Sequence, residues 1–335
     1  MTRERPSIVL AHWPGLGFFD ESALERFDEL GTLLDPEPLA AWDDPRADEL
    51  LAEAEVVVGH WGCPLVDEAM LDRAPNLGLF AYAAGTVKLT VSDAIWDRGI
   101  RVTSGANANA EPVAEFTLAA ILFANKGVLW RRIGTDPIEE SADELMGRGW
   151  GNYDRTIGIV GASLIGRRVI ELLQAFPHLH VALYDPFVSP EEADELGVTK
   201  MELTDLCAAS DVLSIHAPAL ATTHQMISAE QLDALRDGAT VINTARGWVL
   251  DHDALVPHLS TGRLRAILDV TEPEPLPDDS VLRTLPNVFL TPHLAGTQGS
   301  ELGRMADYAA EEVRRWSAGE PGLNEVHREH LDRLA

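Results

Sequence analysis

A glycine turn between a strand and a helix is the feature that most constrains the fold of this chain. Residues 156–160, TIGIV, are β-branched and apolar like a buried strand, and the turn that follows leads into a helical pattern. A second strand ends at Asp185, about twenty residues further on. This order of elements is that of the βαβ unit that binds dinucleotides. Gly161 is expected to make the tight turn, and Gly166 to let the helix pack against the strand.

The start of this helix is expected to bind the pyrophosphate of the cofactor, because backbone N–H groups at a helix N-terminus point at a bound anion. This assigns pyrophosphate contacts to Leu164 and Ile165. Ser163 replaces the second glycine of the fingerprint, and its hydroxyl is expected to donate to a phosphate oxygen. Asp185 is expected to accept hydrogen bonds from the ribose and to repel a 2′-phosphate, which predicts NAD, with NADH preferred over NADPH. Taken alone, such a motif is also compatible with a glycine-containing turn in any α/β protein.

Three later segments place ionisable side chains at the ends of successive predicted strands. They are residues 243–247 with Arg246, residues 268–275 with Glu272 and Glu274, and residues 291–296 with His293. An arginine binds a carboxylate with two parallel hydrogen bonds, and a histidine beside a carboxylate exchanges protons near neutral pH. This is the equipment for reducing a 2-keto acid. Each residue taken singly is equally typical of a surface ion pair or a loop anchor.

With the glycine turn, Asp185 and the segment of residues 210–218, SDVLSIHAP, these motifs occur in the order found in the D-isomer-specific 2-hydroxyacid dehydrogenases. The chain resembles that family from about residue 83 to residue 296. The resemblance implies that Arg246, Glu274 and His293 are catalytic. Glu274 is chosen over Glu272 because the family's glutamate follows five residues after the aspartate that is here Asp269.

The resemblance also implies further contacts. Asp269 is expected on the nicotinamide side of the cofactor, and the loop of residues 83–86 is expected to offer the backbone N–H groups of Ala84 and Gly85 to the substrate carboxylate. Val87 and Thr90 depart from the family where acids are common. The other cofactor contacts implied are His216, Pro218, Thr223, Thr244, Ala245 and Gly296.

Length and charge restrict the classes of function. A chain of 335 residues with 46% hydrophobic content predicts two domains of ordinary size. A formal net charge of −28 argues against binding to nucleic acid or to an anionic membrane, so a site for an anionic substrate must be locally positive. Two cysteines far apart in sequence and no signal-length apolar stretch predict a cytoplasmic protein. The scattered histidines show no metal-ligand spacing, and no metal is expected.

The remaining pattern predicts the domain organisation. Residues 7–11 and 55–59 are expected as buried parallel strands, and residues 21–30 as a helix between them. Both strands end in a His-Trp pair, which marks either a wall facing the substrate, with His60 as a contact, or the cap of a core. A polar, glycine-containing stretch, residues 135–150, is expected as a loop or arm. Residues 300–316 are expected as a helix that returns to the first domain.

A second helix is expected to start within residues 106–116, with Pro112 in its first turn. The family resemblance implies that this helix links the two domains. It is compatible with a dimer interface and with a buried core helix. The predicted fold class is α/β, with two doubly wound parallel-sheet domains of Rossmann or flavodoxin type and the active site in the cleft. The expected substrate domain comprises residues 1–104 and 297–335, and the expected NAD domain comprises residues 105–296.

The predicted function is hydride transfer between NAD(H) and C2 of a 2-keto or D-2-hydroxy acid by a homodimer. Arg246 would bind the carboxylate, and His293 would act as acid and base beside Glu274. An NAD(H)-sensing dimeric binding protein, as some corepressor relatives are, is the alternative. The sequence does not identify which 2-keto acid is the substrate.

Overall fold

The structure is a computed structural model that describes residues 5–15, 17–130 and 150–333. The contacts divide the chain into two compact units, residues 1–109 with 297–335 (unit 1) and residues 110–296 (unit 2). The division lies within a helix, whereas the sequence placed the domain boundary at residue 104. The expected loop of residues 135–150 lies outside the described residues except for its last residue.

Unit 1 contains a five-stranded parallel sheet in the order β2-β1-β3-β4-β5. This is the order of a doubly wound sheet that changes direction between β1 and β3. Its strands are β1 (Ser7–Ala11), β2 (Thr32–Leu33), β3 (Val56–Gly59), β4 (Leu79–Tyr82) and β5 (Arg101–Ser104). Its helices are α1 (Glu21–Leu30), α2 (Ala47–Glu53), α3 (Glu68–Arg73), α4 (Ala94–Asp97) and α12 (Leu302–Ala318). The strands predicted near residues 7–11 and 55–59 and the helix at residues 21–30 are confirmed.

Both faces of this sheet are buried, as a parallel sheet requires. Because side chains alternate along a strand, Ile8 and Val56 face a core with Phe27 of α1 and Val313 of α12. Val9 and Val57 face the opposite core, which contains residues of α2, α3 and α4. Asp20 starts α1 by accepting a hydrogen bond from the Ala23 N–H group.

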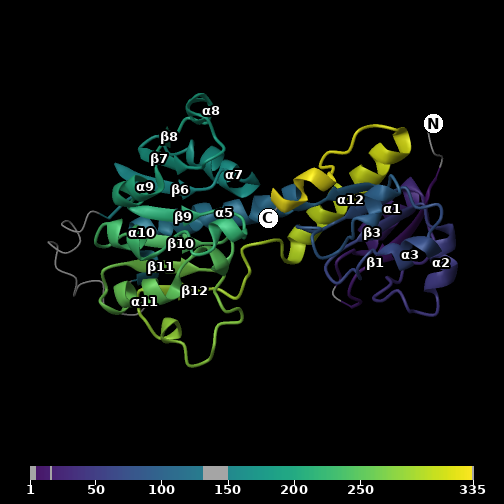
Figure 1. The fold of residues 1–335 in the computed structure, drawn as a ribbon, viewed down its shortest axis with the longest axis horizontal. Helices are drawn as coiled ribbons and strands as arrows, with labels where there is room; N and C mark the ends of the chain where they lie inside the picture. Colours follow the sequence, from purple (N-terminus) through teal and green to yellow (C-terminus); the bar gives the residue numbers. More distant parts are fainter. Residues whose placement is uncertain (1–4, 16, 131–149, 334–335) are drawn as a thin grey trace. The chain divides into compact units, whose positions relative to one another are not determined.

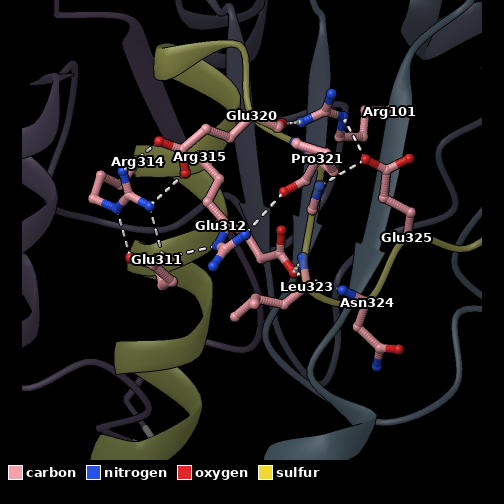
Figure 2. Close-up of polar contacts among 11 residues, drawn as sticks. Arg101, Glu311, Glu312, Arg314, Arg315, Glu320, Pro321, Leu323, Asn324 and Glu325 are labelled. Carbon is pink, nitrogen blue, oxygen red and sulfur yellow. Dashed lines mark hydrogen bonds and ion pairs between the residues drawn. The ribbon is translucent and has the colours of Figure 1, made fainter.

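The segment after α12 returns to the edge of the sheet, as Figure 2 shows. Glu312, only 1% exposed, accepts hydrogen bonds from the backbone N–H groups of Leu323 (3.0 Å) and Asn324 (3.1 Å). Asn324 in turn exchanges hydrogen bonds with Ser104, since the Ser104 N–H donates to the Asn324 carbonyl and the Asn324 amide donates to the Ser104 carbonyl. A buried carboxylate on α12 therefore holds the segment that pairs with β5.

Unit 2 contains a seven-stranded parallel sheet in the order β12-β11-β10-β9-β6-β7-β8 (Figure 1). Its strands are β6 (Arg155–Val160), β7 (Leu179–Tyr184), β8 (Thr199–Lys200), β9 (Val212–Ile215), β10 (Thr240–Asn243), β11 (Arg265–Leu268) and β12 (Val288–Leu290). Its helices are α7 (Leu164–Leu173), α8 (Pro190–Glu195), α9 (Leu203–Ala209), α10 (Ala229–Ala234) and α11 (His252–Ser260), with most of α5 (Ala106–Lys126). Short 3₁₀ turns are η1 (Val128–Trp130), η2 (Ala221–Thr223), η3 (Gly247–Val249), η4 (Val281–Arg283), η5 (Gly299–Glu301) and η6 (Arg328–Arg333). The predicted α/β class with two doubly wound parallel sheets is confirmed.

Two cores cover the faces of this second sheet. One combines Leu213 and Val241 with side chains of α9, α10 and α11. The other combines Ile159 and Ile242 with side chains of α5, α7 and α8. The β-branched strand pattern therefore reflects burial on both faces.

The helix start predicted within residues 106–116 is confirmed, because α5 begins at Ala106. The prediction that Pro112 lies in the first turn is wrong, since it is the seventh residue and lies in the second turn. The Ser104 hydroxyl accepts the Ala106 N–H, and the Gly105 carbonyl accepts the Asn109 N–H, which closes the first turn before Pro112. The helix predicted at residues 300–316 is confirmed as α12, which begins two residues later, after η5.

Candidate active site

The carboxyl edge of the seven-stranded sheet brings the three predicted catalytic residues onto neighbouring loops. Arg246 follows β10, Glu274 lies in the loop after β11, and His293 lies in the loop after β12. Because β10, β11 and β12 are adjacent and parallel, their carboxyl ends share one edge. The topology explains why residues far apart in sequence lie near one another.

His293 and Glu274 form a direct pair. The distance between His293 Nδ1 and Glu274 Oε1 is 2.6 Å, and the two side chains are 50% and 42% exposed. A carboxylate only accepts hydrogen bonds, so the shared proton belongs to Nδ1 when the imidazole is neutral. The Nε2 atom is then the one left to exchange a proton with a substrate.

Asp269 holds the loop that carries His293. Its buried carboxylate accepts hydrogen bonds from the Thr291 hydroxyl (2.6 Å) and from the N–H groups of Leu294 (2.8 Å) and Ala295 (3.0 Å). His293 itself has φ +55°, a left-handed conformation that is uncommon for a residue with a side chain. The sequence assigned Asp269 only to the nicotinamide and missed this role, because its partners are more than twenty residues away.

Arg246 lines a pocket of about 350 Å³. Its Nη1 donates to the Ala245 carbonyl at 2.6 Å, and within the described part of the chain no carboxylate lies within ion-pair distance of the guanidinium. Burial lowers the pKa of Arg246 and the charge of Glu274 opposes this, but an arginine remains charged at neutral pH. The site therefore offers a positive group that is free to bind an anion.

Gly247 is required where the two loops of this pocket meet. A Cβ at this position would lie 2.1 Å from the backbone carbon and oxygen of Thr271. The pocket is also lined by Trp248, Glu272 and Glu274. The absence of a side chain at Gly247 thus lets the loop after β10 approach the loop after β11.

A second pocket of about 340 Å³ includes His293 and shares Thr271 and Glu274 with the first. Arg283 is the arginine in its lining. The Nε and Nη2 atoms of Arg283 donate to the carbonyls of Pro277 and Leu276, so this guanidinium is largely engaged within its own loop.

The glycine turn has the geometry expected of a dinucleotide cradle. Gly161 has φ +95°, and a Cβ on Gly166 would lie 2.0 Å from the Gly161 carbonyl oxygen. The N–H groups of Leu164 and Ile165 lie in the first turn of α7, where a helix provides no acceptor of its own. Ser163 differs from the expectation, because its hydroxyl donates to the His216 carbonyl at 2.9 Å instead of being free for a phosphate.

Asp185 lies beside this turn. Its two carboxylate oxygens accept the N–H groups of Ala162 (2.7 Å) and Phe187 (2.8 Å). Each oxygen has a second acceptor position, so the carboxylate retains capacity for ribose hydroxyls. The residues described at this turn fit a dinucleotide.

The other expected cofactor residues lie along the carboxyl edges of β9, β10 and β12. His216 is buried and hydrogen-bonded to Ser214. Burial lowers the pKa of His216 to about 3, so its imidazole is neutral. The Thr244 hydroxyl bonds that of Thr117 at 3.0 Å, and the Thr223 hydroxyl donates to the Pro218 carbonyl. Ala245 is buried and Gly296 half-buried. Their side chains mainly shape the loops, which leaves backbone groups for the cofactor.

In unit 1 the expected substrate residues differ in exposure. Gly85 is half-buried, and its carbonyl accepts a hydrogen bond from the Ser104 hydroxyl, a contact that the sequence gave no reason to expect. Ala84 is buried. His60, which the sequence offered either as a substrate contact or as part of a core cap, is 0% exposed and stacks on Phe18 with the ring centroids 4.1 Å apart, as a core cap would. Burial lowers the pKa of His60 to about 3, so the imidazole is uncharged.

The described residues contain no group of three or more histidine, cysteine, aspartate or glutamate side chains arranged to hold a metal ion. None of their helices has both the length and the hydropathy needed to cross a bilayer.

Comparison with known proteins agrees with these motifs. Residues 135–295 match the family model "D-isomer specific 2-hydroxyacid dehydrogenase, NAD binding domain". A glyoxylate reductase of Korarchaeum cryptofilum is 34% identical over 268 residues, which cover 79% of this chain and 80% of that protein. A D-3-phosphoglycerate dehydrogenase of Mycobacterium bovis is 33% identical over 83% of this chain, which spans only 52% of the length of that relative.

The solved structures agree in fold. A phosphoglycerate oxidoreductase from Rhizobium etli has a TM-score of 0.78 and 26% identity to this chain, over 97% of this chain and 99% of that one. The order of the motifs, the family model and the glyoxylate reductase that is matched over most of its length together show that the chain belongs to the D-isomer-specific 2-hydroxyacid dehydrogenase family.

Proposed function

We propose that this protein reduces a 2-keto acid to a D-2-hydroxy acid with NADH, and catalyses the reverse reaction with NAD. The observation that carries the proposal is the 2.6 Å contact between His293 and Glu274 at a sheet edge that also presents Arg246, which has no ion-pair partner among the described residues. An anion-binding group and a proton-exchanging group on one sheet edge are what the reaction requires.

The residues have separate roles in this proposal. Arg246 binds the substrate carboxylate through its guanidinium and polarises the keto oxygen. His293 donates a proton from Nε2 to that oxygen during reduction and removes it during oxidation. Glu274 accepts the hydrogen bond from Nδ1, which fixes the tautomer and stabilises the imidazolium. NADH, when bound, would supply the hydride that reduces C2.

The chain's own residues would hold the cofactor. The N–H groups of Leu164 and Ile165 would bind the pyrophosphate, and Gly161 makes the tight turn, at φ +95°, that leads into this helix start. Asp185 would bind the ribose and disfavour NADPH, because a 2′-phosphate would face a carboxylate. Asp269 would also contact the nicotinamide side of the cofactor. It would do so through the acceptor positions of its carboxylate that the hydrogen bonds to the loop of His293 leave unused.

The substrate carboxylate would also accept hydrogen bonds from the backbone N–H groups of Ala84 and Gly85, as the family resemblance implies. Assembly as a homodimer and a cytoplasmic location belong to the same proposal and rest on that resemblance alone.

The test is NADH consumption, followed by absorbance, with a panel of 2-keto acids that includes glyoxylate and hydroxypyruvate. We expect turnover, and we expect His293→Ala to lower kcat by roughly a hundredfold or more while NADH still binds. His180→Ala, at an exposed histidine on β7, is the matched control and should retain wild-type kcat. NADH binding without turnover of any acid would instead support the NAD(H)-sensing binding protein.

A further inference from the structure

The charges around Arg246 bear on which acids the site accepts. Of the side chains that line its pocket, Arg246 is positive and Glu272 and Glu274 are negative. The substrate carboxylate engages the arginine, and Glu274 is already paired with His293. A second anionic group on the substrate would then face carboxylates with no free cation in this pocket.

The rest of the pocket lining is mostly apolar, with Thr271 as its polar member. Trp248 lies two residues after Arg246, and its indole N–H donates to the Leu220 carbonyl at 2.9 Å. The centroid of the His224 ring lies 4.0 Å from that of the indole. These contacts hold the Trp248 indole in place. The indole and Leu220 together give the pocket an apolar surface that suits a substrate with a hydrocarbon side chain.

We propose that the preferred substrate is a monoanionic 2-keto acid with an uncharged, apolar side chain, and that Glu272 selects against acids with a second negative charge. This inference rests on the proposed function, since it takes Arg246 as the carboxylate-binding residue. The high negative charge of the whole chain acts in the same direction, because it repels a dianion more strongly than a monoanion.

Two cationic side chains outside this pocket would contradict the proposal if either bound a second anionic group of the substrate. Arg283 lines the neighbouring pocket, but it donates to loop carbonyls and lies 3.8 Å from Asp278. Lys88 is half-buried three residues after Gly85 in unit 1. If Lys88 received a second anionic group, dianionic acids would be preferred.

The test compares acids of equal chain length, 2-oxopentanoate and 2-oxoglutarate, which differ by one terminal carboxylate. We expect kcat/KM to be at least about tenfold higher for 2-oxopentanoate. Glu272→Gln should raise kcat/KM for 2-oxoglutarate about threefold at low salt and leave 2-oxopentanoate within about twofold, the scale of an exposed charge interaction. Glu195→Gln makes the same change of charge at an exposed position of α8 and should alter neither value.

Binding is measured in parallel as the rise in Tm when each acid is added in the presence of NADH. A larger rise with 2-oxopentanoate supports the proposed preference, and this readout does not depend on turnover. Preference for 2-oxoglutarate in either assay would overturn the inference while leaving the reductase function intact, and loss of that preference in Lys88→Met would identify the cation responsible. Binding of the acids without reduction of any would contradict the proposed function alone.

Discussion

Replacing Asp269 by asparagine is expected to release the loop that carries His293. The carboxylate accepts one hydroxyl and two backbone N–H groups, from Thr291, Leu294 and Ala295. Asparagine keeps one accepting oxygen and places an N–H donor where the other oxygen was. The N–H group of Ala295 then faces a donor inside the protein and loses its acceptor.

The size of the effect follows from these contacts. A hydrogen bond to a charged group contributes about 1.5–3 kcal/mol, and a buried donor without a partner is costly to retain. The loop also has to hold His293 at φ +55°, a conformation that costs about 1–3 kcal/mol. We expect Asp269→Asn to lower the free energy of unfolding by about 2 kcal/mol. We also expect kcat to fall roughly ten- to a hundredfold, because His293 is displaced from its partner.

Urea unfolding and steady-state kinetics measure the two effects, and KM for NADH is recorded to separate loss of cofactor binding from loss of kcat. Thr291→Val is the control, since it removes one donor but keeps both backbone N–H groups on the carboxylate. It should cost about 1 kcal/mol and reduce kcat much less. If Asp269→Asn unfolds like the wild type and retains its kcat, the carboxylate does not hold the loop.

Three further predictions follow from individual contacts. Ser104→Ala removes the donor to the Gly85 carbonyl and should raise KM for the keto acid severalfold without changing KM for NADH; an unchanged KM for the acid would contradict the positioning role. Asp185→Ser should narrow the ratio of kcat/KM between NADH and NADPH, and a wild-type preference for NADPH would refute the role of this acid. Burial lowers the pKa of His216 to about 3, so as pH falls below about 6.5 the unfolded chain gains a proton that the folded chain does not. Stability from this group is therefore present at neutral pH and is lost on acidification by about 1.4 kcal/mol per pH unit. His216→Asn should reduce that slope in urea unfolding between pH 6 and pH 4, and an equal slope would show that His216 is not buried neutral.

Much of the fold could be predicted because local pattern and burial agree. The β-branched runs at residues 7–11 and 156–160 lie in sheets that are buried on both faces. A nearly continuous apolar run is the pattern that such buried parallel strands require, so it predicts them directly. The glycine turn was predictable because Gly161 and Gly166 meet steric requirements that a Cβ would violate. The pairing of Glu274 with His293 followed from the family register.

The structure departs from expectation where a contact between distant segments decides the position of a side chain. His60 lies behind Phe18, which comes from a different loop, so its burial leaves no trace in the sequence around residue 60. The Ser163 hydroxyl donates to the carbonyl of His216, in the loop after the adjacent strand β9, and not to a phosphate. The start of α5 depends on Ser104, whose side chain also reaches the Gly85 loop.

In the proposed reaction Glu274, and not its neighbour Glu272, supports the proton transfer by His293. Steady-state kinetics of Glu274→Gln and Glu272→Gln distinguish the two residues, when kcat is measured for reduction of a monoanionic 2-keto acid and NADH binding is checked in both. We expect kcat to fall roughly tenfold or more in Glu274→Gln, because the hydrogen bond at 2.6 Å loses its carboxylate, and to stay within about twofold of wild type in Glu272→Gln. Equal kcat values in the two variants, or a loss confined to Glu272→Gln, would contradict this assignment.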